Sequence, residues 1–171
     1  MRIHALLLAL ALPVFPGCVL DFDFDDWDTA GSGESLVVDD AYVEGDLGDV
    51  QGVSSEARVA NAYESYGYVN IELRAQGRGW AVMHMLDLET DELQVGDRYD
   101  SQDPATPYVG LVGCSGPEDN TWDFDRSADR VVVEVEEGST PDKLRVQYRA
   151  EYSTYDGETQ YASGSLEIER F

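Results

Sequence analysis

Hydrophobic and polar residues alternate along most of the chain after residue 35, and residues 144–152 give the clearest example. There, every second side chain is apolar or aromatic and the others are charged or carry an amide. The side chains expected on one buried face are Leu144, Val146, Tyr148, Ala150 and Tyr152. Residues 68–74, 130–136 and 165–169 repeat the pattern. A period of two is typical of antiparallel strands with one face in a core and the other in solvent.

Turn-forming residues separate these segments, for example in residues 137–142 and at Asp156-Gly157. No amphipathic helical pattern follows residue 33. Residues 80–86 are apolar on both faces, which favours a central strand covered on both sides. The sequence therefore predicts an all-β domain over residues 35–171, an antiparallel β-sandwich or small β-barrel of roughly eight strands. Its last three strands are expected to form a meander.

The N-terminal residues have a different pattern, with Arg2 followed by an unbroken apolar run from Ala5 to Leu12 and then by Pro13. The run is too short to cross a bilayer as a helix, which takes about 20 apolar residues. It fits the apolar region of a secretory signal peptide. We therefore expect residues 1–17 to be a signal peptide.

The end of this leader reads Phe15-Pro16-Gly17-Cys18 and resembles the lipobox of bacterial lipoproteins. Gly17 and Cys18 match that pattern, whereas Phe15 and Pro16 depart from it. The resemblance implies cleavage between Gly17 and Cys18 and a lipid anchor, with diacylglyceryl and an acyl chain such as palmitate, on Cys18. Val19 follows the cysteine, and similarity to enterobacterial lipoproteins then implies the outer membrane of the cell envelope.

The alternative is cleavage after Ala9-Leu10-Ala11, which would leave a secreted or periplasmic soluble protein. Cys18 could then form a disulfide with Cys114 in an oxidising compartment.

Residues 18–34 are expected to be the lipidated cysteine and an acidic tether, because Asp21-Phe-Asp-Phe-Asp-Asp-Trp-Asp28 precedes a Gly/Ser run. The alternating aspartates resemble the start of a calcium loop. That loop needs glycine at its sixth position and glutamate at its twelfth, where this chain has Asp26 and Ser32. We therefore expect no specific ion there.

The charge balance limits the partners, since 35 acidic and 11 basic residues give a formal net charge of -24. Such a chain repels phosphate backbones, which argues against nucleic-acid binding. His84 is the only histidine after the leader, and with two cysteines in the chain a Cys/His zinc site cannot form. No metal centre or cofactor is expected, and His84 is interpreted as a structural residue of the core or of its rim.

Few residues of the chain are candidates for catalysis or for ligand binding. Cys114 is expected to be a buried, unreactive thiol, and no catalytic residue is predicted. Asp123, Asp125 and Asp129 are candidate weak cation sites in an acidic loop. Tyrosines in strands and loops could contact sugars or proteins. They are Tyr63, Tyr66, Tyr68, Tyr148, Tyr152, Tyr155 and Tyr161.

Three functions remain open from the sequence. The first is a lipid-anchored cell-envelope protein whose non-catalytic β-domain binds a protein partner, glycan or ion. The second is a small secreted or envelope hydrolase that uses acidic residues, and the third is a lipocalin-like ligand carrier. The first is preferred, which predicts that the protein is not an enzyme; its oligomeric state is left open.

Overall fold

The computed structural model describes residues 34–90, 93–117, 122–136 and 143–169. These residues belong to one compact unit, Gly31–Phe171. The predicted signal peptide and almost all of the tether lie outside the described residues. Every regular element in the described part is a β-strand, and it contains no helix long and apolar enough to span a membrane.

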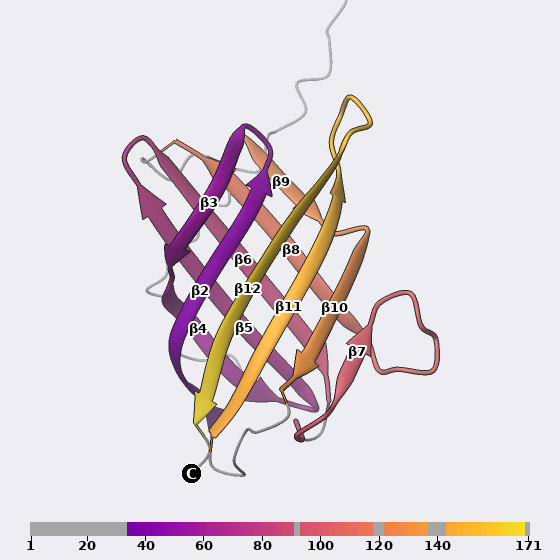
Figure 1. Ribbon diagram of the computed structural model, residues 1–171. Coiled ribbons are helices and arrows are strands. Elements are labelled where there is room, and N and C mark those ends of the chain that lie inside the picture. Colours follow the sequence, from indigo (N-terminus) through magenta and orange to yellow (C-terminus); the bar gives the residue numbers. More distant parts are fainter. Residues whose placement is uncertain (1–33, 91–92, 118–121, 137–142, 170–171) are drawn as a thin grey trace, which may run out of the picture. The chain divides into compact units, whose positions relative to one another are not determined.

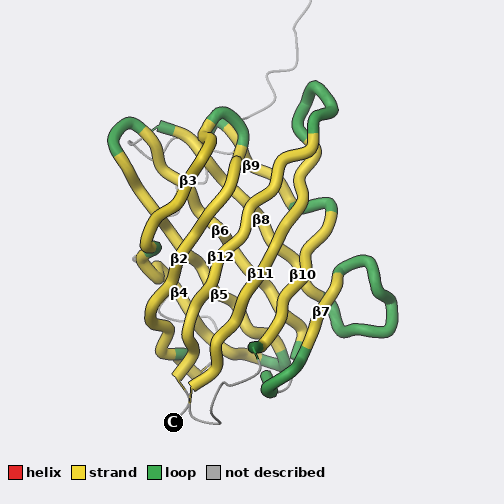
Figure 2. Tube along the Cα trace, in the orientation of Figure 1, coloured by secondary structure: helices red, strands yellow, loops and turns green. Residues whose placement is uncertain are grey.

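Two antiparallel sheets of six strands each form the domain. Sheet A contains, in spatial order, β1 (Glu34–Ser35), β4 (Arg58–Ser65), β5 (Tyr68–Gly77), β6 (Trp80–Glu89), β8 (Val109–Gly116) and β9 (Phe124–Ser127). Sheet B contains β3 (Val50–Glu56), β2 (Val37–Leu47), β12 (Thr159–Glu169), β11 (Lys143–Ser153), β10 (Arg130–Val135) and β7 (Arg98–Asp100). Figures 1 and 2 show the two sheets stacked face to face, with their strands crossing at an angle.

The prediction of an all-β domain is confirmed, and of its two forms the structure is a sandwich: the sheets are not closed into a barrel. The described residues contain twelve strands instead of roughly eight. β1, β7 and β9 have only two, three and four residues, too few for a period of two to be visible in the sequence. The predicted meander is confirmed, because β10, β11 and β12 are consecutive neighbours.

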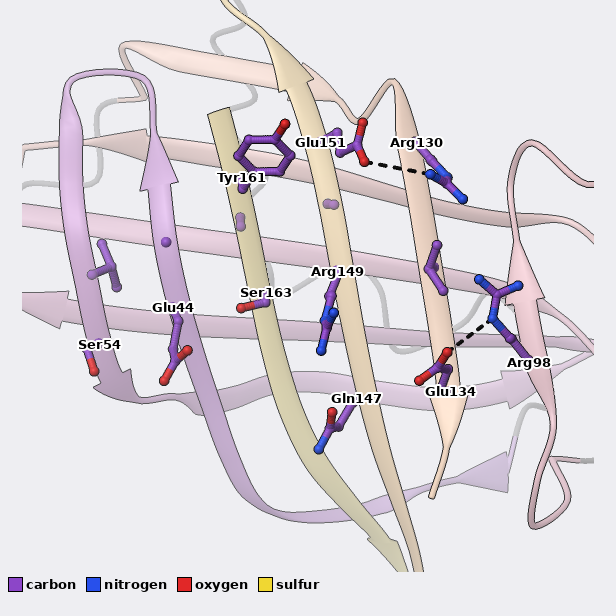
Figure 3. A pocket seen from close by; sticks show the side chains of 15 residues that line it. Glu44, Ser54, Arg98, Arg130, Glu134, Gln147, Arg149, Glu151, Tyr161 and Ser163 are labelled. Carbon is purple, nitrogen blue, oxygen red and sulfur yellow. Dashed lines mark hydrogen bonds and ion pairs between the residues drawn. The ribbon is translucent and has the colours of Figure 1, made fainter. Parts of the chain in front are cut away.

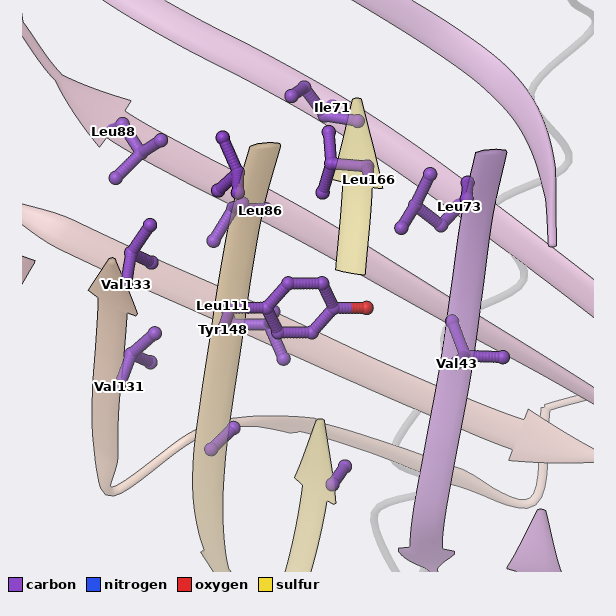
Figure 4. Packing of buried hydrophobic residues seen from close by; sticks show 14 of the residues in the cluster. Val43, Ile71, Leu73, Leu86, Leu88, Leu111, Val131, Val133, Tyr148 and Leu166 are labelled. Carbon is purple, nitrogen blue, oxygen red and sulfur yellow. The ribbon is translucent and has the colours of Figure 1, made fainter. Parts of the chain in front are cut away.

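The core lies between the sheets, and the alternation in the sequence determines which side chains enter it. In β11, Leu144, Val146, Tyr148, Ala150 and Tyr152 are all buried, as predicted. Figure 4 shows Tyr148 among aliphatic side chains from both sheets, such as Leu86 and Val43. β6 is a central strand between β5 and β8, and both its faces are buried over residues 81–84, which confirms the interpretation of the apolar run.

A buried hydrogen bond between two side chains crosses this core. His84 of β6 and Tyr148 of β11 share a hydrogen bond of 2.7 Å between Nδ1 and the hydroxyl oxygen. Tyr148 lies over Gly164, its partner in β12, and a Cβ atom at that glycine would come within 2.2 Å of the Tyr148 hydroxyl. Glycine at this position therefore allows the tyrosine to reach the histidine. The core role predicted for His84 is confirmed, since its side chain is buried.

Candidate functional site

A groove of about 700 Å³ lies on the outer face of sheet B, the face opposite the core. Six strands contribute to it, and Figure 3 shows the polar side chains that line it. Those labelled there are Glu44, Ser54, Arg98, Arg130, Glu134, Gln147, Arg149, Glu151, Tyr161 and Ser163. The groove is thus formed by the polar half of the alternating pattern whose apolar half fills the core.

Strand register places these side chains in rows across the sheet. Arg149 of β11 lies between Val132 of β10 and Ser163 of β12, and Ser163 is in turn opposite Glu44 of β2. Directly opposed side chains on one face of a sheet have their Cβ atoms about 5 Å apart and can act on one ligand together. The register therefore makes Arg149 the centre of the groove.

The other two arginines of the groove are held by ion pairs. Arg98 Nε lies 3.0 Å from Glu134 Oε1, and Arg130 Nη1 lies 3.8 Å from Glu151 Oε1. Both also reach Asp100, at 3.3 Å from Arg98 and 2.9 Å from Arg130. The hydrogen bond from Arg130 is the main reason why the pKa of Asp100 falls to about 2. Arg98 and Arg130 thus already bind carboxylates of the protein itself, which leaves fewer of their N–H donors for a ligand.

Arg149 differs from them, because none of the ion pairs between described residues includes it. The two nearest glutamates in register, Glu134 and Glu151, are engaged by Arg98 and Arg130. A guanidinium group carries five N–H donors in a planar arrangement. Arg149 therefore presents a positive charge and donors to the groove.

Basic residues are concentrated on this face. Five of the chain's 11 basic residues lie on it, in a protein with a net charge of -24. They are Arg98, Arg130, Lys143, Arg145 and Arg149. Lys143 and Arg145 both pair with Glu167 at one end of the sheet. Nearly half of the chain's basic residues thus lie on the outer face of sheet B, together with acidic residues such as Glu44, Glu134 and Glu167.

The structure does not gather the three aspartates proposed as weak cation sites into one site. The Asp125 carboxylate lies 3.6 Å from the Cys114 thiol, and the Asp123 amide donates to the Ser115 carbonyl. Asp129 follows β9 and lines a different, smaller hollow. Within the described ranges, no group of three or more His, Cys, Asp or Glu side chains is placed to hold a metal ion. Gly17 and Cys18, the predicted cleavage and lipidation site, lie outside those ranges.

Cys114 is a free thiol and is buried, as expected. Burial is the main reason why its pKa is raised, and the neighbouring Asp125 carboxylate raises it further. A thiol that keeps its proton is a poor nucleophile. The structure thus agrees with an unreactive role for Cys114.

The tyrosines divide into two classes that the sequence alone did not separate. Tyr148 and Tyr152 are core residues, whereas Tyr66, Tyr155 and Tyr161 are 85%, 82% and 60% exposed. Of these exposed tyrosines, Tyr161 lines the groove. Sequence reasoning also missed the arginines of the groove. The available signal was their position on the polar side of the alternating segments, although register between strands was needed to bring them together.

Comparisons with protein-family models, with curated proteins and with solved structures find no match for this chain.

Proposed function

We propose that this protein is a lipid-anchored protein of the bacterial cell envelope whose β-sandwich binds a carboxylate-bearing ligand, without catalysis, in the groove of sheet B. The observation that carries the proposal is the position of Arg149, central in the groove and outside the ion pairs described there. Arg98 and Arg130 are already paired, so Arg149 is the groove's main binding group.

The chemistry of the groove favours a carboxylate. Arginine donates two parallel hydrogen bonds to a carboxylate, and such charge-assisted bonds are about twice as strong as neutral ones. Ser163 is opposite Arg149, so a hydroxyl is available for a neighbouring group of a glycan or peptide. Gln147, two residues away on the same strand, already donates from its amide nitrogen to Glu136. Tyr161 adds an exposed ring for the apolar side of the ligand.

The strongly negative net charge does not oppose this proposal at short range. Charges in solution are screened beyond about 8 Å at physiological ionic strength. A ligand carboxylate in the groove would therefore respond mainly to the local charges, which are the three arginines, the two glutamates that they hold, and Glu44 beyond Ser163.

A non-catalytic role is preferred over the hydrolase because two of the three glutamates that line the groove, Glu134 and Glu151, are tied to arginines. A hydrolase that uses acidic residues usually needs a pair of carboxyl groups, and only Glu44 of these three lies outside the ion pairs of the described residues. It is preferred over a lipocalin-like carrier because apolar side chains from both sheets occupy the space between them.

Binding can be tested by titrating the mature domain with oligogalacturonate, with its fully methyl-esterified form and with an oligoglutamate peptide. We expect a carboxylate ligand to bind and the ester to bind at least about tenfold more weakly. Arg149→Gln should weaken binding by about tenfold, while Arg149→Lys should restore only part of it because lysine lacks the planar donor pair.

Arg78→Gln is the matched control, since Arg78 is exposed in the turn between β5 and β6, away from the groove. Equal binding of the acid and its ester, or unchanged binding by Arg149→Gln, would overturn the groove assignment.

The anchor has its own test. Cells grown with labelled palmitate should label the wild-type protein but not Cys18→Ala, and mass spectrometry should find an N-terminus at a lipid-modified Cys18. A mature N-terminus at Leu12, or a Cys18–Cys114 disulfide in the native protein, would show that the anchor is absent while leaving the groove assignment intact.

A further inference from the structure

A second, smaller hollow of about 200 Å³ lies around Gly110 of β8. Its walls come from β6, β8, β9, the β9–β10 connection and β10, and from Ser101 and Tyr108, which follow β7 and precede β8. The polar or aromatic residues that line it are Asp87, Ser101, Tyr108, Ser127 and Asp129. None of them lines the groove of sheet B, so this hollow is independent of the function proposed above.

Tyr108 forms one wall of the hollow in an unusual way. Tyr108 directly precedes β8, and its side chain folds along the start of that strand, so that a Cβ atom at Gly110 would lie 2.3 Å from the Tyr108 hydroxyl. The end of the ring therefore occupies the space that a side chain at position 110 would take. The tyrosine is still 57% exposed. Glycine at 110 thus fixes an aromatic ring beside the hollow while leaving much of it accessible.

The other walls are negative. Asp87 of β6 is directly opposite Gly110 in the register, and Asp129 lines the hollow from the β9–β10 connection. The ion pairs between described residues include neither carboxylate. Asp87 is half-buried, and this burial raises its pKa, which is the response of a carboxylate that has lost water without gaining a cation.

From this geometry we infer that the hollow binds the ammonium group of an amino sugar or of a lysine side chain. A cation within about 6 Å of a tyrosine ring is attracted by the ring's negative face, and carboxylates beside it add charge-assisted hydrogen bonds. The three N–H donors of an ammonium group match the two carboxylates and the Ser127 hydroxyl, whereas the Ser101 hydroxyl oxygen already accepts a hydrogen bond from the Val131 amide.

The volume of the hollow and the kinds of side chains that line it favour an ammonium group over a larger molecule, a metal ion or an anion. A water molecule in the liquid occupies about 30 Å³, so the hollow has room for an alkylammonium group or one sugar ring but not for a larger ligand. Calcium takes about six to eight oxygen ligands, and no group of three or more acidic, histidine or cysteine side chains in the described chain could supply a metal centre. An anion would be repelled by both aspartates.

The test uses the mature protein and records backbone amide shifts of Gly110 and Ala128 by NMR during titration. The probes are n-butylammonium and n-butanol, then glucosamine and lysine amide, each beside its N-acetylated counterpart. We expect the amines to shift these two amides and the neutral counterparts to bind at least about tenfold more weakly. Whichever amine binds more tightly identifies the source of the ammonium group.

Asp87→Asn and Tyr108→Leu should each weaken n-butylammonium binding by about fivefold to tenfold. The matched controls are Asp39→Asn in β2 and Tyr155→Leu in the β11–β12 turn, exposed residues outside both the hollow and the groove, and both should leave n-butylammonium binding unchanged. If Tyr108→Leu does not fold, the comparison of n-butylammonium with n-butanol on the wild type decides alone. Equal binding of amine and neutral probe, no shift at Gly110 and Ala128, or complete displacement of the amine by equimolar calcium would overturn the inference.

Discussion

The two faces of β11 are made of alternate residues of one strand, yet they obey different rules. On the inner face, Val146 and Tyr148 are almost inaccessible to water and pack against sheet A. On the outer face, Arg149 and Gln147 line an open groove. Which residues lie on the inner face follows from the sequence alone, because apolar side chains recur at every second position. The function of the outer face depends on which strands lie beside it, because isolated polar residues become a site only through register.

The largest expected effect contrasts adjacent positions on the two faces. Val146→Asp should destabilise the domain by more than about 4 kcal/mol, since it buries a charge without a partner. Gln147→Lys, one residue further on the exposed face, also adds a charge but places it opposite Glu134, and it should cost less than about 1 kcal/mol. Urea denaturation followed by tryptophan fluorescence measures both. Similar losses for the two variants would break the distinction between the faces.

The next effect is a pH dependence that arises from the inner face. Burial lowers the pKa of His84 from 6.5 to about 4, so the unfolded chain binds a proton on this histidine before the folded protein does. Stability should therefore fall as the pH falls from about 6.5 to about 4, by about 3 kcal/mol in total, since one pKa unit corresponds to about 1.4 kcal/mol.

Urea midpoints of the wild type and His84→Gln across this range isolate the histidine, because the other titrating groups are shared. The wild type should lose more stability than the variant over this interval. Parallel pH profiles would show that His84 does not titrate as described.

A substitution on β12 tests how closely the inner face is packed. Gly164→Ala should cost about 2 kcal/mol, because its new methyl group would collide with the Tyr148 hydroxyl and displace it from His84. Ser163→Ala, the adjacent position facing outward, is the control and should change stability by less than about 0.5 kcal/mol. Thermal unfolding by circular dichroism measures both, and a neutral Gly164→Ala would mean that the tyrosine has room to move.

The same chemical change at two core tyrosines should give different results. Tyr148→Phe removes the hydroxyl that bonds His84 and leaves a buried ring nitrogen without a partner, which should cost about 1 to 2 kcal/mol. The Tyr152 hydroxyl has no hydrogen-bond partner within the described part of the protein, so Tyr152→Phe should be neutral or slightly stabilising. Chemical denaturation of the pair measures the difference, and equal losses would contradict the assigned hydrogen bond.

The smallest effect on stability belongs to the outer face. Arg149→Gln should change the free energy of unfolding by less than about 0.5 kcal/mol, because no ion pair between described residues depends on Arg149. Together with weaker carboxylate binding, this would mark Arg149 as a ligand-binding residue. A loss comparable to that of Tyr148→Phe would assign it a structural role instead.

Period-two patterning was enough to predict the strands β5, β10, β11 and β12, the buried face of β11 and the central place of β6. It did not reveal β7, whose three residues are too few for a pattern, although β7 contributes Arg98 and Asp100 to the ion pairs of the groove. The site was harder to predict, because Arg130 and Arg149 are 19 positions apart in the sequence and meet only through the pairing of β10 with β11. A single strand shows which face a residue occupies, but its neighbours depend on the whole topology.

The pairing of β2 with β12 has a consequence for how the chain folds. β2 (Val37–Leu47) is the first long strand of the domain and β12 (Thr159–Glu169) is the last, and they are adjacent in the middle of sheet B. Sheet B therefore cannot be completed until nearly the entire chain is available, and closing such a large loop is entropically slow. A chain stopped before β12 would leave β2 and β11 as unpaired edges, which favour association with other chains. The complete sandwich therefore cannot form until β12 has been synthesised.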